Sequence, residues 1–187
     1  MRSRDPSDAE LAAAAQAGDR EAFGRLVERY VGQARRLARA FLGNGADADD
    51  AAQDAFLAAF RNLGRYDLGR PFGPWLMRIV ANAAADRRRR RKVRATEEIP
   101  AGTADSRPDP ERQTLRRELR DVLEHALAAL PERRRMAVVL FDVEGYSHQE
   151  IADVLEVPVG TVRSDVYHAR RALREVLAAR GFLEEET

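Results

Sequence analysis

The chain has 187 residues, of which 44% are hydrophobic, so it can bury one medium-sized hydrophobic core or two small ones. It contains no cysteine, which excludes a disulfide framework and a thiolate metal site and suits a reducing cytoplasm. The net charge is only +1, because 32 basic residues offset 31 acidic ones, but one short segment, 87–96, is strongly basic and the sequence after it is acidic. This pattern argues against a protein that coats DNA nonspecifically.

Capping signals mark the first two predicted helices. Ser7 and Glu10 form a capping box, in which each side chain accepts a hydrogen bond from the backbone N–H of the other residue, and Gly18 ends the short helix that follows. Asp19 caps a longer helix, whose apolar residues recur every three or four positions as far as Gly43. We therefore expect the second helix to bury one face in a core.

A third helix is predicted over 47–63, with a loop rich in Gly, Arg and Pro over 64–73 and a fourth helix from Pro74. Arg87 to Arg94 contains seven basic residues in eight positions. Such a run can be a solvated helix end, but like charges repel one another without an anion nearby, which favours contact with nucleic acid. Trp75 lies between the loop and this run. It can pack in a core or stack on unpaired bases.

The second half of the chain follows a polar segment without periodicity. We expect residues 95–108 to form a flexible linker between a domain at 1–94 and a second domain at 109–187. Helices are predicted from Asp109 to Leu130 and, after Pro131, from Glu132 to Val143. No strand pattern or internal repeat is visible. The fold class is therefore all-α, with two small helical domains.

The segment from Ser147 to Ala179 predicts a helix-turn-helix. Ser147 and Glu150 form a second capping box, and Val157-Pro158 cannot continue the helix that starts there. The next helix has an apolar stripe and an opposite polar face, on which these residues gather: Arg163, Ser164, Tyr167, His168, Arg171 and Arg174. Arginine can bind guanine edges or phosphates, and a helix of this width fits the major groove. Asp165 is expected at the edge of this face, where it would repel phosphates.

A basic helix can also be the solvated face of an ordinary helical hairpin. The capped short helix, the tight turn and the longer basic helix together match the helix-turn-helix motif at every element. The combination therefore favours a DNA-binding helix over a basic helix that only faces solvent.

Acidic residues gather at the start of the third predicted helix: Asp47, Asp49, Asp50 and Asp54. A calcium loop of the EF-hand type needs glycine at the sixth position, and that position, counted from Asp47, is Ala52. We therefore expect no metal site. The carboxylates can instead favour the positive end of the helix dipole. A docking face on which Gln53 and Asp54 are exposed fits the charge pattern better.

Catalysis is not expected. The three histidines have no paired ligand spacing, and neither a Ser/His/Asp arrangement nor a glycine-rich phosphate loop is visible, so we expect no cofactor. No apolar run reaches the length of a membrane span, and the N-terminus has no signal-peptide core. These absences favour a cytoplasmic protein without direct insertion into a membrane.

Two blocks of the sequence resemble a known family. Residues 47–56, DADDAAQDAF, and residues 60–90, FRNLGRYDLGRPFGPWLMRIVANAAADRRRR, resemble region 2 of bacterial sigma factors. Residues 130–173 resemble region 4: LPERRRMAVVLFDVEGYSHQEIADVLEVPVGTVRSDVYHARRAL. The order of the two regions, the linker and the lack of regions 1.1 and 3 are similar to the extracytoplasmic-function (ECF) subgroup of the sigma-70 family.

This resemblance implies a promoter-recognition subunit of RNA polymerase without enzymatic activity. Region 2 would dock on the β′ clamp of the core enzyme through Asp50, Gln53 and Asp54, and region 4 would contact the β flap. The implied contacts to the opened minus-10 element are these: Arg65, Phe72, Trp75, Arg78, Asn82, Arg87, Arg88 and Arg89. In the helix-turn-helix, the polar face of the second helix would contact the minus-35 element. An anti-sigma factor is the implied regulatory partner.

The sequence departs from the family pattern at Asp165 and His168, where many members have basic residues, so the resemblance does not transfer a minus-35 sequence preference. Two other classes of function stay open. A stand-alone helix-turn-helix regulator would bind duplex DNA as a symmetric dimer, but it would leave Trp75 and the basic run without a role. An enzyme that uses the Asp cluster would need the ligand spacing that is missing.

Overall fold

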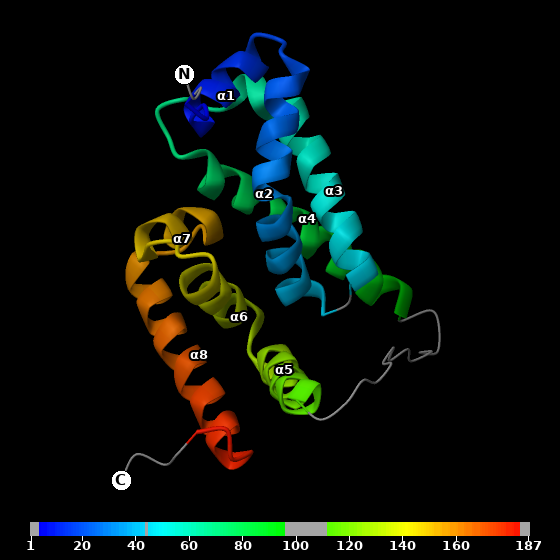
Figure 1. The fold of residues 1–187 in the computed structure, drawn as a ribbon, viewed down its shortest axis with the longest axis vertical. Helices are drawn as coiled ribbons and strands as arrows, with labels where there is room; N and C mark the ends of the chain where they lie inside the picture. The colour runs from blue at the N-terminus through cyan, green and yellow to red at the C-terminus, as the bar shows by residue number, and fades with distance from the viewer. Residues whose placement is uncertain (1–3, 44, 96–111, 184–187) are drawn as a thin grey trace.

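The structure is a computed structural model that describes residues 4–43, 45–95 and 112–183. Every regular element in these ranges is helical, which confirms the all-α prediction (Figure 1). No helix in these ranges is long and apolar enough to cross a membrane.

Four α-helices and a 3-10 turn form the N-terminal group: α1 (Asp8–Gln16), α2 (Arg20–Leu42), α3 (Gly45–Asn62), η1 (Leu63–Arg65) and α4 (Phe72–Ala95). The first capping box is present, because Ser7 Oγ accepts a hydrogen bond from Glu10 N at 3.3 Å and Glu10 Oε2 accepts one from Ser7 N at 2.7 Å. Asp19 caps α2, which ends at Gly43 with a φ of 77°. Only glycine adopts this left-handed conformation without strain.

The fourth helix begins two residues earlier than expected. It starts at Phe72, so Pro74 lies inside its first turn rather than at its opening. The first four N–H groups of a helix have no intrahelical acceptor, and proline therefore costs no hydrogen bond at this position.

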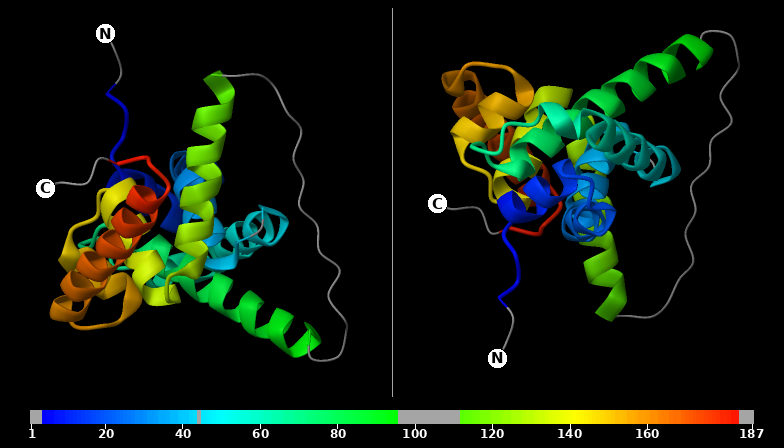
Figure 2. Two further views of the ribbon diagram at one scale, coloured as in Figure 1. Left: turned by 90° about the horizontal axis from the view of Figure 1, so that it is seen from below. Right: turned by 90° about the horizontal axis from the view of Figure 1, so that it is seen from above.

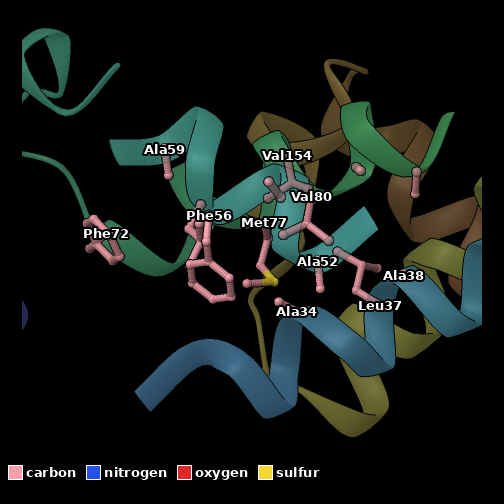
Figure 3. Close-up of a cluster of buried hydrophobic side chains, with 14 of the residues drawn as sticks. Ala34, Leu37, Ala38, Ala52, Phe56, Ala59, Phe72, Met77, Val80 and Val154 are labelled. Atoms are coloured by element: carbon pink, nitrogen blue, oxygen red, sulfur yellow. The ribbon is translucent and has the colours of Figure 1, made fainter. Parts of the chain in front are cut away.

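The core of this group lies where α2, α3 and α4 meet. Leu37, Met77 and Val80 are fully buried there, and alanines such as Ala34 and Ala52 separate the larger side chains (Figure 3). Small residues at these contacts allow the helix backbones to approach closely. This packing holds α3 and α4 in fixed positions, so their outward faces can serve as binding surfaces.

The C-terminal group contains these elements: α5 (Arg112–Ala129), α6 (Glu132–Val138), a single π-helical turn η2 (Val139–Val143), α7 (His148–Leu155) and α8 (Val159–Ala179). The helix predicted over 132–143 is thus present, with its last turn wound as a π-helix. The predicted helix start at Asp109 and all but the first residue of the predicted linker lie outside the described residues.

The two groups pack against each other, which the sequence did not predict. Helix α7 contacts α4, and α6 contacts α2 (Figure 1). Ile151 and Val154 of α7 belong to the same buried cluster as Val80 of α4. In contrast, the C-terminal part of α4 projects away from the rest of the molecule (Figure 2).

Candidate nucleic-acid interface

The helix-turn-helix is built from the predicted local signals. Ser147 Oγ accepts a hydrogen bond from Glu150 N at 3.2 Å, and Glu150 Oε2 accepts one from Ser147 N at 2.9 Å. Glu156 ends α7 in a left-handed conformation with a φ of 55°, and Pro158 precedes the first residue of α8. The turn is tight because a single left-handed residue, Glu156, ends α7 only three residues before α8 begins.

The polar face of α8 is free of the core. Its six predicted members are all exposed in the structure: Arg163, Ser164, Tyr167, His168, Arg171 and Arg174. Tyr167 is 63% exposed, and Arg171 Nε donates to Glu175 Oε1 at 2.9 Å on the helix surface. This face can donate hydrogen bonds to phosphates and base edges without any rearrangement of the core.

Asp165 does not lie at the edge of this face, so the expected repulsion of phosphates was wrong. The residue is only 3% exposed, and its carboxylate accepts a hydrogen bond from Arg133 Nε at 2.5 Å. Arg134 Nε lies 3.6 Å from the other carboxylate oxygen. The hydrogen bond from Arg133 to Asp165 raises the pKa of the Arg133 guanidinium. Asp165 thus joins α8 to α6, and two cations compensate its charge.

Arg170 also has a structural contact. Its Nε donates to Asp142 Oδ2 at 2.8 Å, and the guanidinium lies 4.9 Å from the centre of the Phe141 ring. The hydrogen bond to Asp142 raises the pKa of Arg170. These contacts fix α8 against the end of η2, so Arg170 has a structural role in holding the helix.

An aromatic cluster forms the second candidate surface, at the start of α4. The Trp75 ring lies 4.8 Å from Tyr66 and 5.4 Å from Phe72, measured between ring centres. Phe72 is 3% exposed, so its ring supports the cluster and is not available to a base in this conformation. Trp75 is half-buried and lines a hollow of about 300 Å³ together with Arg70 and Arg78. Trp75 thus packs partly in the core, and its stacking on unpaired bases stays a prediction.

Polar side chains extend this surface along α4. Arg78, Asn82 and Arg89 recur at helical spacing and are exposed. Together with Trp75 they form what we call the α4 face. Arg65 is exposed in the neighbouring 3-10 turn. A surface with an aromatic ring, an amide and several cations suits single-stranded nucleic acid.

Arg87 and Arg88 are placed differently. Arg87 turns toward α3, where its guanidinium pairs with Asp50 and approaches Asp47 and Asp54 with N–O distances of 3.3 Å and 3.4 Å. Arg88 pairs with Glu132 of α6. Neither guanidinium is free in this structure, because carboxylates from other helices already accept its hydrogen bonds.

The acidic surface of α3 adjoins an apolar groove that the sequence did not reveal. Asp50 and Gln53 lie on its rim, and Phe23 and Phe56 line it. Phe60 is 45% exposed there, and Leu57 is 50% exposed. Periodicity could not separate Phe60 from Phe56, because residues four apart share one helix face. The groove and the carboxylates together have the character of a protein-binding surface.

Metal binding has no support in the same region. Among the residues that the structure describes, no group of three or more His, Asp or Glu side chains is arranged to hold a metal ion. The cations beside the α3 carboxylates are guanidinium groups. Arg87 lies beside Asp50 and Asp54, Arg35 pairs with Asp49, and Arg91 approaches Asp47.

Comparison with known proteins shows that two parts of the chain match two regions of one protein family. The family model for sigma-70 region 2 matches residues 26–94, and the model for sigma-70 region 4 matches residues 120–173. The chain is 43% identical to the ECF RNA polymerase sigma factor SigM of Mycobacterium tuberculosis over 91% of this chain and 85% of that protein. It is 34% identical to the ECF RNA polymerase sigma-E factor of Escherichia coli, over 89% and 92% of the two chains.

The solved structures agree with this relationship. The structure of CnrH in complex with the cytosolic domain of CnrY has a TM-score of 0.70 and 34% identity, over 92% of this chain and 97% of that chain. The region 2 match contains α3 and almost all of α4 with the aromatic cluster, and the region 4 match contains α7 and α8 as far as Leu173. The chain therefore belongs to the sigma-70 family of bacterial sigma factors, within its extracytoplasmic-function group.

Proposed function

We propose that the chain is a promoter-recognition subunit that binds core RNA polymerase in the cytoplasm and directs transcription initiation without catalytic activity of its own. The observation that carries this proposal is the presence of region 2 and region 4 in one chain, each with an exposed polar or basic surface. A regulator with only a helix-turn-helix would have no use for the α3 groove and the α4 face.

The acidic and apolar surface of α3 is the proposed contact to the β′ clamp. Asp50, Gln53 and Asp54 supply hydrogen-bond acceptors and charge, and the adjoining groove exposes Leu57 and Phe60. Protein interfaces combine an apolar centre with a polar rim in this way. The proposed contact of region 4 is the β flap.

The α4 face is the proposed contact to the opened minus-10 element. A base that leaves the duplex loses stacking worth a few kcal/mol, which a pocket must replace with ring contact and hydrogen bonds. The hollow beside Trp75 offers ring contact, and Asn82 and Arg78 offer hydrogen-bond donors. Arg65, Arg88 and Arg89 would hold the backbone, whereas Phe72 and Arg87 would act by supporting the surface from inside.

The polar face of α8 is the proposed contact to the minus-35 element in duplex form. It would present Arg163, Ser164 and Tyr167 near the start of the helix and His168, Arg171 and Arg174 farther along. In a helix-turn-helix, base contacts come mainly from the N-terminal part of the second helix. We therefore assign base reading to the first three residues and phosphate contact to the arginines that follow.

An anti-sigma factor is the proposed regulatory partner. CnrH, which shares the fold and 34% of its sequence with this chain, was solved in complex with the cytosolic domain of CnrY. A protein that covers the α3 and α4 surfaces would block polymerase and promoter together.

Two substitutions test this division of roles. Asn82→Ala should leave polymerase binding unchanged and slow promoter opening about fivefold to tenfold, because an amide that holds an unstacked base contributes about 1–1.4 kcal/mol. Gln53→Ala should instead weaken polymerase binding. Pull-down with core polymerase and permanganate detection of unpaired thymines measure the two steps separately. Loss of polymerase binding in Asn82→Ala would contradict the assignment of the α4 face to DNA.

A further inference from the structure

A hollow of about 220 Å³, which we call the Arg135 hollow, lies between the C-terminal part of α2 and the elements α5, α6 and η2. Its apolar lining comes from these side chains: Ala40, Leu127, Ala128, Val139 and Val143. Three cations also line it: Arg36, Arg39 and Arg135. We propose that this hollow binds a small organic monocarboxylate with an apolar body, such as an aromatic ring. The proposed site shares no residue with the polymerase and promoter contacts described above.

Arg135 is the residue that points to a ligand. It is only 7% exposed, and its Nε has no hydrogen-bond partner among the residues that the structure describes. Nη1 reaches the carbonyl oxygen of Ala128 at the long distance of 3.4 Å. Burial and the nearby guanidinium of Arg88 lower the pKa of Arg135. A buried cation without a counter-charge is costly, and a carboxylate in the hollow would supply both the charge and the missing acceptors.

The other two cations of the hollow already have partners. Arg36 donates to both carboxylate oxygens of Glu144, at 2.7 Å and 2.9 Å. Arg39 Nη2 lies 3.4 Å from Glu124 Oε1. One positive charge is therefore left over, and it matches a ligand with one negative charge. A phosphate monoester, which carries a charge of about −1.5 to −2 at pH 7, fits this balance less well.

The volume of the Arg135 hollow limits the size of the ligand. Drug-sized ligands occupy pockets of about 300–1,000 Å³, whereas an apolar cavity of about 150 Å³ holds a benzene molecule. A hollow of about 220 Å³ thus suits one ring with one carboxylate. Val143 is 59% exposed, so a ring that packs on it would remove apolar surface from water.

An acidic side chain of a partner protein is the other possible occupant of the hollow. Such a side chain carries only methylene groups beside its carboxylate, so it would leave much of the apolar lining uncovered. The combination of one uncompensated cation with an apolar lining therefore favours a ligand that has a larger apolar body.

The test is an NMR titration of the full chain, labelled at its Ala, Leu and Val methyl groups, with benzoate as the probe. Benzamide has the same shape without the charge, and acetate has the charge without the ring. We expect benzoate to shift the methyl signals of the Arg135 hollow, with a Kd on the order of 1 mM for so small a ligand. Benzamide and acetate should bind about tenfold more weakly, because each lacks one of the two interactions.

Variants of the chain separate the two interactions. Arg135→Gln should weaken benzoate binding about tenfold and leave benzamide binding unchanged. Its matched control is Arg120→Gln, which removes the same charge from an exposed position on α5 and should bind benzoate like the native chain. Ala128→Leu keeps every charge and fills part of the hollow from an exposed position, so it should weaken both ligands even if Arg135→Gln does not fold.

Three results would overturn the proposal. Equal affinities for benzoate and benzamide would exclude Arg135 as the group that binds the carboxylate. Benzoate shifts confined to methyl groups outside the hollow, such as those of Val27 and Val31 in the α3 groove, would exclude the site. Acetate binding as tight as benzoate binding would exclude a ring-bearing ligand and favour an acidic side chain of a partner protein.

Discussion

At the scale of single residues, the charge that α8 offers to DNA depends on which charged side chains are exposed, more than on how many the helix contains. Asp165 is buried between two arginines of α6, whereas the α8 arginines beside it are exposed. A carboxylate can therefore lie in the middle of a DNA-binding helix without repelling DNA, provided that it points into the protein and meets a cation.

Asp165→Asn should lower the free energy of unfolding by about 1–2 kcal/mol, because the amide keeps the shape but loses the charge-assisted hydrogen bond to Arg133. Urea unfolding followed by circular dichroism measures this change. The control is Glu175→Gln, which removes the exposed ion pair with Arg171 and should cost no more than about 0.5 kcal/mol. Equal small effects of the two substitutions would show that the Asp165 contact does not hold α8 against α6.

At the scale of elements, each candidate surface is centred on one helix whose other face lies in the core. Helix α8 turns Val162 and Val166 inward and leaves its arginines outside. Helix α4 turns Met77 and Val80 inward and presents Arg78 and the rest of the α4 face outward. Packing therefore fixes the orientation of the surface, and surface substitutions should change binding without changing the fold.

Arg171→Ala should weaken binding to a promoter duplex and reduce its salt dependence. A lysine or arginine that contacts one phosphate releases about one counterion, so the slope of log affinity against log salt should fall by about one unit. Titrations across a range of salt concentrations, with a duplex selected by the polymerase complex, measure the slope. Arg120→Ala on α5, which removes the same charge elsewhere in region 4, should leave the slope unchanged. An unchanged slope for Arg171→Ala would contradict a phosphate contact.

At the scale of the whole molecule, the two regions share one buried cluster and several ion pairs. The surface proposed for polymerase stays accessible in this arrangement, because the α3 groove lies on helices that α7 does not contact closely.

The part of this structure that the sequence predicted is the part determined by near neighbours. Capping boxes at Ser7 and Ser147 and the glycine at position 43 act within a few residues, and the helices begin and end at or near these signals. The polar face of α8 follows from periodicity within one helix.

Contacts between distant residues could not be predicted in this way. Arg36 meets Glu144 across a separation of 108 residues, and Arg78 meets Glu156 across 78. Periodicity gives the direction of a side chain around its own helix but not the neighbour that it meets. For the same reason, the burial of Phe72 and the exposure of Phe60 could be found only from the packed structure.

The central claim is that this chain gives RNA polymerase its promoter choice. The most direct test combines the purified chain with core polymerase and a library of promoter fragments, and measures run-off transcripts. We predict transcripts from a specific subset of fragments, dependent on the chain and reduced with Gln53→Ala. Tight and specific duplex binding by the chain alone, with no transcript in the presence of core polymerase, would contradict the claim.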